Sequence, residues 1–174
     1  GQDDYNNVLF ENIRISKKNL SAVWFDNCKF INVILEDNSL SNSRFMNCEF
    51  KAVKFLNEKM DNAYIKKCSF KECSFLQTFI EGEQTSWVDS IFDRCIFTDY
   101  KVIYGGLEMM GCSFEKCNLK GLSIKGSELG NVKFIDSDLS NGEIIGSSIV
   151  HCTFRNSNLT NTTLDKVYND TVIE

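Results

Sequence analysis

The sequence repeats with a period of five residues, and this period constrains the fold more than any other feature. Every fifth residue from Phe10 to Ile80 is large and apolar, and the series resumes after two-residue jumps at Trp87 and Met109 to end at Leu164. We denote these 31 positions as i, and they hold 13 of the 14 phenylalanines. Neither a helix of period 3.6 nor a plain strand of period 2 gives this pattern. The sequence therefore predicts a repeat architecture.

Within each unit, the flanking positions have their own character. Position i−2 is mostly small or β-branched, and position i+2 is Asn, Asp or Gly in 20 of the 31 repeats. Asn, Asp and Gly tolerate the left-handed backbone conformation of tight turns. Residues i−2 and i point the same way in an extended segment. Each unit is therefore predicted to be a short strand followed by a corner, with i−2 and i inside.

The sequence also has a longer period of about 20 residues, because every fourth i position is phenylalanine. This column is predicted to form the structural core, with the cysteines at its i−2 positions. It comprises Phe10, Phe30, Phe50, Phe70, Phe92, Phe114, Phe134 and Phe154, with Cys28, Cys48, Cys68, Cys112 and Cys152. The pattern predicts eight four-sided coils, numbered here from the coil that begins at Phe10. Stacking at about 4.8 Å would give a rod of roughly 40 Å.

The sequence resembles the pentapeptide repeat family, whose pattern is A-[D/N]-[L/F]-x-x. Cys117-Asn118-Leu119, Ser137-Asp138-Leu139 and Ser157-Asn158-Leu159 carry the resemblance most closely, and it extends over residues 8–164. The resemblance implies an all-β fold, a right-handed quadrilateral β-helix solenoid of about eight coils. Residues 1–174 are expected to form a single domain, with short insertions near 81–86 and 103–108.

Some residues depart from the pattern or lie outside it. Lys18, Asn38 and Glu58 are polar at i−2 positions of one column, and we expect them to turn outward. The terminal segments are too short and polar to cap the stack, and coil stacks need caps. We therefore expect the chain to be excised from a longer protein, with flanking domains in the same polypeptide.

Charge and hydropathy limit the partners. The chain has 24 acidic and 19 basic residues and a formal net charge of −5. This balance does not suit a strongly basic nucleic-acid binder, and no apolar run approaches the ~18 residues of a membrane span. We expect neither nucleic acid nor membrane as a partner. Proline is absent, as expected where most amides enter hydrogen-bonded ladders.

All eight cysteines occupy position i−2. The close spacing of Cys68 with Cys73 and of Cys112 with Cys117 raises the alternative of metal ligation, but cysteine is also a small hydrophobe that packs well beside phenylalanine. We favour the packing interpretation and expect no metal or other cofactor. Buried free thiols indicate a reducing compartment.

Catalytic chemistry is not indicated. His151 is the single histidine and sits at a corner position, i+2. A Ser-His-Asp or Cys-His arrangement cannot be built from one corner histidine. We expect no catalytic residues and no enzymatic activity.

Outward residues are the candidates for function. Trp24, Arg44 and Tyr64 share position i−1 in coils one to three, and we expect them to stack as an aromatic–cation–aromatic ladder. Phe79 and Tyr104 lie near the two insertions. These five residues are predicted to bind a partner, although surface packing and sealing of the widened corner are the competing interpretations. An outward apolar group is a further candidate, comprising Ile34, Leu56, Leu76, Ile91 and Ile96.

The resemblance implies a protein-interaction or targeting module of a bacterial protein. One setting is a secreted effector that engages a host partner, which would place the protein in the bacterial cytoplasm or the host cell cytoplasm. A DNA-mimicking topoisomerase-protection protein of the quinolone-resistance type is an alternative, as is a structural spacer. The outer surface of coils six to eight is mostly small and polar, so the partner surface is expected on coils one to five.

Overall fold

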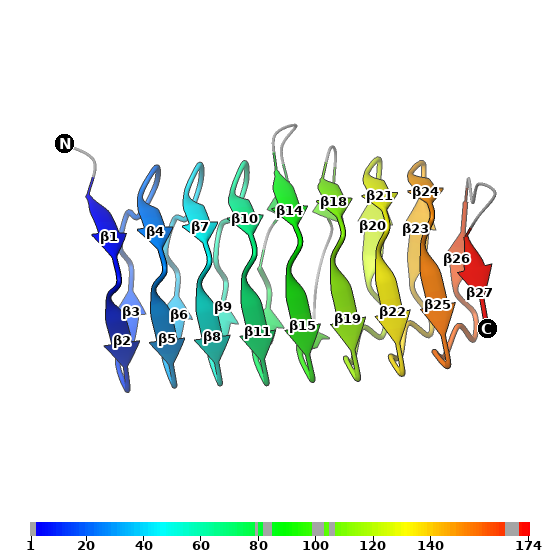
Figure 1. Cartoon of the computed structure of the whole chain (residues 1–174), viewed down its shortest axis with the longest axis horizontal. Coiled ribbons are helices and arrows are strands. Elements are labelled where there is room, and N and C mark those ends of the chain that lie inside the picture. The colour runs from blue at the N-terminus through cyan, green and yellow to red at the C-terminus, as the bar shows by residue number, and fades with distance from the viewer. Residues whose placement is uncertain (1–2, 79, 82–84, 99–102, 105–106, 166–170) are drawn as a thin grey trace.

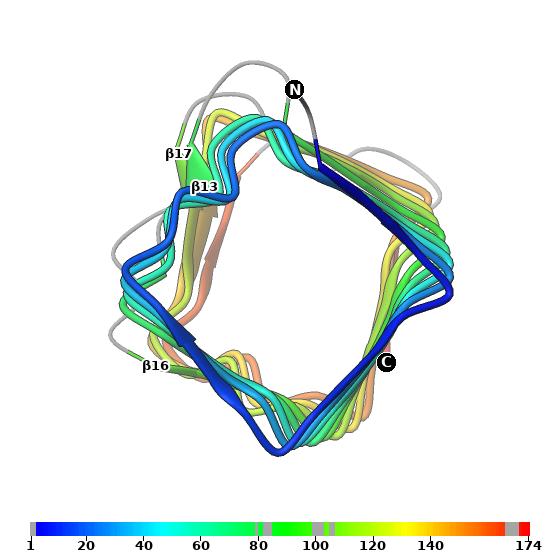
Figure 2. The same cartoon turned by 90° about the vertical axis from the view of Figure 1, so that its left-hand side faces the viewer.

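The computed structural model describes residues 3–78, 80–81, 85–98, 103–104, 107–165 and 171–174, which form short parallel strands. The strands stack along one axis from β1 to β27 (Figure 1). Viewed along that axis, the chain traces a four-sided coil (Figure 2) that repeats about eight times. The described residues contain no α-helix, and thus none that could cross a membrane. The predicted all-β solenoid is confirmed.

Two long sheets form the first two sides of the coil. Side one consists of β1 (Asp4–Asn6), β4 (Trp24–Asp26), β7 (Arg44–Met46), β10 (Tyr64–Lys66), β14 (Ser86–Val88), β18 (Glu108–Met110), β21 (Glu128–Gly130) and β24 (Ser148–Val150). Side two consists of β2 (Leu9–Glu11), β5 (Lys29–Ile31), β8 (Glu49–Lys51), β11 (Ser69–Lys71), β15 (Ile91–Asp93), β19 (Ser113–Glu115), β22 (Lys133–Ile135), β25 (Thr153–Arg155) and β27 (Val172–Ile173).

Sides three and four have strands over only part of their length. Side three consists of β3 (Arg14–Ser16), β6 (Ile34–Glu36), β9 (Lys54–Leu56), β12 (Ser74–Leu76) and β16 (Ile96–Thr98). Side four consists of β13 (Ile80–Glu81), β17 (Ile103–Tyr104), β20 (Ser123–Lys125), β23 (Glu143–Ile145) and β26 (Thr163–Leu164). Isolated bridges continue side three at Asn118, Asp138 and Asn158 and precede side four at Asn19, Ser39 and Lys59.

The register of these strands stacks like residues on like. Phe10 pairs with Phe30, and Phe30 with Phe50. Along this column, neighbouring ring centroids lie 4.5–5.2 Å apart, close to the ~4.8 Å spacing of strands. Seven of the eight rings are buried, whereas Phe10 is half-buried because it belongs to the first coil. The predicted phenylalanine core is therefore present.

The cysteines pack beside these rings. All eight are buried and free. Each Sγ donates a weak hydrogen bond to a backbone carbonyl of the preceding coil at 3.2–3.5 Å, as Cys48 does to Phe25. Cysteine at i−2 thus fills a small space and satisfies a carbonyl oxygen.

The corners adopt the backbone conformation that the sequence predicts. Residues at i+2 have positive φ values, for example Asn27 at 53° and Asn32 at 51°. Asparagine side chains also bond along the stack at these corners: the Nδ2 atom of Asn32 donates to the Oδ1 atom of Asn12 at 2.8 Å. Side-chain hydrogen bonds and tolerance of positive φ together explain the frequency of Asn there.

The expectation that Asn38 and Glu58 turn outward is wrong. Asn38 is 3% exposed and Glu58 is 0% exposed. The Asn38 amide donates to the Glu58 Oε1 atom at 2.8 Å and to the Ile15 carbonyl at 2.9 Å, while its Oδ1 atom accepts from the Lys18 backbone amide at 2.9 Å. Stacking 20 residues apart lets these two side chains satisfy each other, which offsets part of the cost of burying them.

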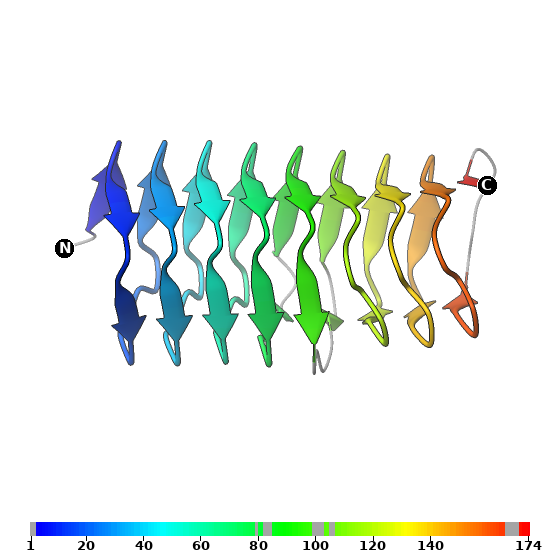
Figure 3. The same cartoon turned by 90° about the horizontal axis from the view of Figure 1, so that it is seen from below.

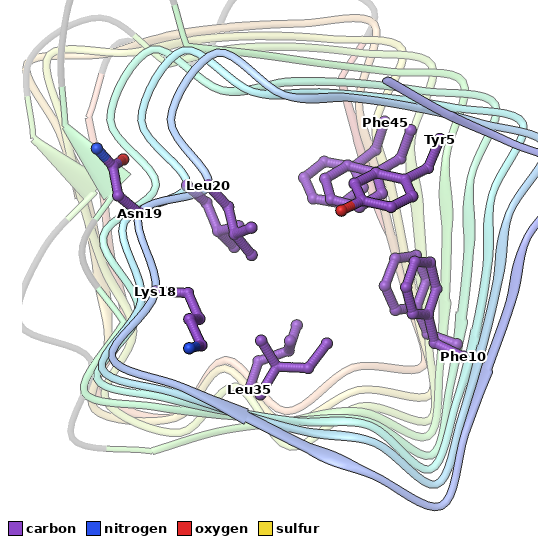
Figure 4. Close-up of a pocket in the computed structure, with 11 residues that line it drawn as sticks. Tyr5, Phe10, Lys18, Asn19, Leu20, Leu35 and Phe45 are labelled. Atoms are coloured by element: carbon purple, nitrogen blue, oxygen red, sulfur yellow. The ribbon is translucent and has the colours of Figure 1, made fainter. Parts of the chain in front are cut away.

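The two ends of the rod differ (Figure 3). At the C-terminal end, β27 pairs with β25 and extends side two over the last coil. At the N-terminal end, the interior of the first coils opens into a cavity of about 300 Å³. Lys18 does not turn outward as expected either: it is exposed at this open end, but its side chain reaches into the cavity, opposite the rings of Tyr5, Phe10 and Phe45 (Figure 4).

Candidate interaction surface

Trp24, Arg44 and Tyr64 stack on the outside of side one, and we name this row the ladder. Their strands β4, β7 and β10 are in register, so Arg44 lies between the two aromatic residues. The Arg44 Cζ atom lies 4.5 Å from the centroid of the Trp24 ring and 5.3 Å from that of Tyr64. Trp24 is 44% exposed. The three side chains thus occupy the predicted arrangement, and their role in binding stays a prediction.

The guanidinium of Arg44 is held from several directions. Its Nη2 atom lies 4.0 Å from the Met46 Sδ atom on the same strand. A hollow of about 210 Å³ beside Trp24 is lined in part by Asp4, Asp26 and Met46. Because a cation over an aromatic face is attracted to the ring quadrupole, the stack orders a side chain that would otherwise sample many rotamers.

The apolar group of Ile34, Leu56, Leu76, Ile91 and Ile96 occupies sides two and three. Ile91 and Ile96 are 49% and 42% exposed, whereas the other three are half-buried. Leu56 and Leu76 are neighbours in register on β9 and β12. The group therefore offers a discontinuous apolar surface on a different side of the rod from the ladder.

The two candidates near the insertions are placed only in part. Phe79 lies outside the described residues. The backbone of Tyr104 is part of β17 and pairs with Glu81 and Lys125, but its side chain lies outside the description. Their predicted part in binding stays a prediction.

Titratable groups in the interior have shifted pKa values. Burial raises the pKa of Cys112 to about 11, so its thiol stays protonated and unreactive at neutral pH. Burial likewise raises the pKa of Glu58 to about 8, against the opposing effect of its hydrogen bond from Asn38. The Oε2 atom of Glu58 is buried and has no hydrogen-bond partner in the described part of the chain.

Within the described ranges, no three His, Cys, Asp or Glu side chains are grouped so that they could hold a metal ion. The histidine, His151, is exposed at a corner with φ of 54°.

Sequence reasoning missed an apolar column next to the ladder. On side one, position i+1 is Val88, Met110 and Val150 in coils four, five and seven, and all three are half-buried. Met110 lies over Gly130, where an added Cβ would come within 2.6 Å of the Met110 methyl group. The signal for this row is present in the sequence, because apolar residues recur at position i+1 of side one.

Comparison with solved structures supports the fold. Full-length QnrB1, described as a plasmid-mediated fluoroquinolone resistance protein, superimposes with a TM-score of 0.51 at 16% identity, covering 93% of each chain. A trypsin-treated form of QnrB1 gives a TM-score of 0.49 at 20% identity, covering 93% of this chain and 91% of the other. The likeness to full-length QnrB1 shows that this chain has the β-helix fold of pentapeptide repeat proteins.

A further similarity is weaker. HetL, a pentapeptide repeat protein from the cyanobacterium Nostoc sp. strain PCC 7120 that is involved in heterocyst differentiation regulation, has a TM-score of 0.36 at 11% identity, covering 98% of this chain and 89% of HetL. No family model and no curated protein matches the sequence.

Proposed function

We propose that this β-helix is a protein-interaction module that binds its partner through the ladder. The observation that carries the proposal is the half-exposed Trp24 with Arg44 stacked on its ring. Tryptophan, tyrosine and arginine are the residue types that contribute most to protein–protein binding. Here the three types stand in one row on a rigid sheet.

The rigidity of the row favours binding. Ordering a long side chain at an interface costs free energy. Arg44 already contacts two rings and Met46, so part of this cost is met before the partner arrives. A pre-ordered surface can therefore bind with fewer contacts than a mobile one.

The cellular setting is part of the proposal. Eight free, buried thiols suit a reducing compartment, such as the bacterial cytoplasm or the cytoplasm of a host cell that receives a secreted effector. The partner would then be another protein in that compartment.

The test is a double substitution of the ladder. Trp24→Ala with Tyr64→Ala should leave the fold intact, because outward substitutions usually change stability little. Partner proteins captured on the wild-type chain should bind the double variant at least ~10-fold more weakly, a loss of about 1.4 kcal/mol or more. Titration of the purified partner measures this change, and thermal denaturation checks the fold.

A matched control uses outward residues of the later coils. Lys133→Ala with Thr153→Ala changes two exposed or half-buried positions on β22 and β25 of side two and should leave binding unchanged. Wild-type affinity for the ladder variant, together with lost affinity for the control, would overturn the proposal.

Topoisomerase protection by DNA mimicry is the second candidate, favoured by the fold likeness to QnrB1. DNA mimicry needs a continuous acidic face, but Lys66, Lys67 and Lys71 interrupt the acidic surface of coils three and four. A gyrase supercoiling assay with and without a quinolone separates the two candidates, because only the mimic should restore supercoiling.

A further inference from the structure

The outward column that holds the ladder continues beyond Tyr64. The next residues in register are Ser86 on β14, Glu108 on β18 and Glu128 on β21. Along the rod, the column therefore changes from an aromatic ring to a short hydroxyl side chain and then to two carboxylates.

On the side of coil four, the half-buried Tyr64 is followed in register by a half-buried residue with a short side chain. Arg44 covers the face of this ring that is turned toward coil two. On the opposite side, the neighbour in register is Ser86, which is too short to cover a phenol ring. Two strand spacings of about 4.8 Å separate the strands of Tyr64 and Glu108. We name the space over Ser86, between Tyr64 and Glu108, the slot.

The far wall of the slot carries negative charge. Glu108 and Glu128 are exposed and directly opposite each other on neighbouring strands, an arrangement of like charges that is unfavourable. Neither carboxylate forms an ion pair with any residue in the described part of the chain. A cation bound next to Glu108 would relieve this repulsion.

The side of the slot is apolar. Val88 and Met110 lie two residues along the strands from Ser86 and Glu108, and both are half-buried. Such a surface suits the methylene stem of a long cationic side chain. Lys66 is in register with Val88 and places one positive charge beside the slot. The two carboxylates of Glu108 and Glu128 outweigh it, so the charge around the slot is negative.

We propose that the slot binds an arginine side chain of the partner protein. The guanidinium stacks on the face of Tyr64 that is turned toward Ser86, as Arg44 stacks on the other face, and pairs with Glu108. Arginine fits better than lysine because its planar group can stack on a ring and pair with a carboxylate at the same time. This inference rests on the proposed function, since it names the chemistry of the partner that the ladder surface recognises.

The first test fills the slot from within the chain. Ser86→Arg should raise the thermal midpoint by about 1–3 °C, because its guanidinium can contact both Tyr64 and Glu108. Ser86→Lys is the matched control and should raise it less, and Glu108→Gln combined with Ser86→Arg should remove most of the gain. A lower midpoint for Ser86→Arg, or a gain that persists without the Glu108 carboxylate, would overturn the slot.

The second test uses short blocked peptides as probes, observed by NMR. A pentapeptide with one central arginine between glycines should shift the Tyr64 ring and the Ser86 amide signals. The matched peptides carry lysine or citrulline, which has the shape of arginine without its charge, and should bind about two- to fivefold more weakly. Equal binding of the three peptides would contradict recognition of arginine.

The purified partner separates this inference from the proposed function. Ser86→Arg and Glu108→Gln leave Trp24 and Arg44 in place. If the partner loses affinity for the Trp24 and Tyr64 double variant but binds both slot variants normally, the module function holds and the arginine slot is wrong. If all the variants bind normally, both proposals are wrong.

Discussion

Glu58 places a carboxyl group inside coil three. Its Oε1 atom accepts from Asn38, but its Oε2 atom is buried without a partner among the described residues. The pKa is raised to about 8, mainly because burial disfavours the charged form and to a smaller extent because the carboxylates of Asp37 and Glu36 lie nearby. The folded protein therefore holds Glu58 in its neutral form at neutral pH.

This pKa shift predicts a dependence of stability on pH. The pKa of Glu58 is higher in the folded chain than its ordinary value of 4.5, so the folded state binds the proton more tightly than the unfolded state. The free energy of unfolding should fall as pH rises from about 4.5 to about 8, by up to a few kcal/mol. Glu58→Gln should remove most of this slope and be the more stable protein at pH 9.

Urea denaturation at several pH values measures the slope. The control is Glu49→Gln, which changes a carboxyl group that is largely exposed on side two. A wild-type slope that Glu58→Gln leaves unchanged would show that the Glu58 carboxyl is not buried as an acid.

The inward position of Glu58 also marks a limit of sequence reasoning at the residue scale. Taken alone, a glutamate is expected to avoid the interior because burial of a charge is costly. The residue that reduces this cost is Asn38, which comes into contact only through the 20-residue register. The direction of the side chains at position i is easier to predict, because large apolar side chains are stable only when they point inward. The fold was therefore predictable from the phenylalanine column.

At the scale of elements, the hydrogen-bonded turn of each coil lies at one corner in the first coils and at another corner in the last coils. In coils one to three, a backbone hydrogen bond closes a turn after side four, as from the Val23 amide to the Leu20 carbonyl. In coils six to eight, the equivalent turn follows side three, as from Leu122 to Leu119. Asx side chains support the later turns: Asn118 accepts from the Lys120 amide at 3.2 Å.

The sequence indicates the corner of the turn in some coils but not in all of them. Asn118, Asp138 and Asn158 stand at i−1 before the later turns and accept from the amide two residues on, as Asx residues commonly do. Asn19 does the same in coil one, whereas Ser39 and Lys59 replace it in coils two and three. The turns of coils two and three nevertheless form at the same corner as the turn of coil one, with hydrogen bonds from the Ser43 amide to Leu40 and from the Ala63 amide to Met60.

The candidate surface was predictable to a similar extent. Trp24, Arg44 and Tyr64 are separated by 20 residues, and position i−1 cannot enter the core, so their stacking followed from the period. The slot was not predicted, although the jump to Trp87 already places Ser86 in the same column as Tyr64, 22 residues later. What the period does not give is which of these outward side chains contact each other, because that depends on their length and direction.

The phenylalanine stack predicts a graded effect of truncation. The Phe50 ring lies between Phe30 at 4.7 Å and Phe70 at 4.5 Å. Phe50→Ala should lower the free energy of unfolding by roughly 3–5 kcal/mol, because it leaves a cavity in a packed core. Phe10→Ala is the matched control, since that ring is half-buried and stacks on Phe30 alone within its column, and it should cost about 1–2 kcal/mol.

Equilibrium denaturation in urea compares the two variants with the wild type. A loss below about 1 kcal/mol for Phe50→Ala, or equal losses for both variants, would mean that position in the stack does not determine the contribution of a ring.

At the scale of the whole molecule, the described strands of each coil pair only with strands of the neighbouring coils. Stability in such a solenoid is approximately a sum of repeat and neighbour terms, so local opening is expected to begin where a coil has one neighbour. The two ends are unequal. The N-terminal coil is open over its cavity, whereas β27 covers part of the last coil and its Val172 amide donates to the Cys152 carbonyl at 2.9 Å.

The eight cysteines can report this gradient, because they are spread along the rod from Cys28 to Cys152 and all are buried. Under native conditions, labelling by an aromatic disulfide reagent should be slow, since all eight thiols are covered. Burial also raises the pKa of Cys28, Cys112 and Cys152 and so favours their protonated form. Cys28, next to the open end, should react first, then Cys152 beneath β27, and last Cys73 and Cys95 in the middle of the rod. Mass spectrometry of peptides after timed labelling gives the order.

Simultaneous reaction of all eight thiols at the rate of global unfolding would show that the rod opens as one unit. Rapid labelling of most thiols under native conditions would show that they do not face the interior.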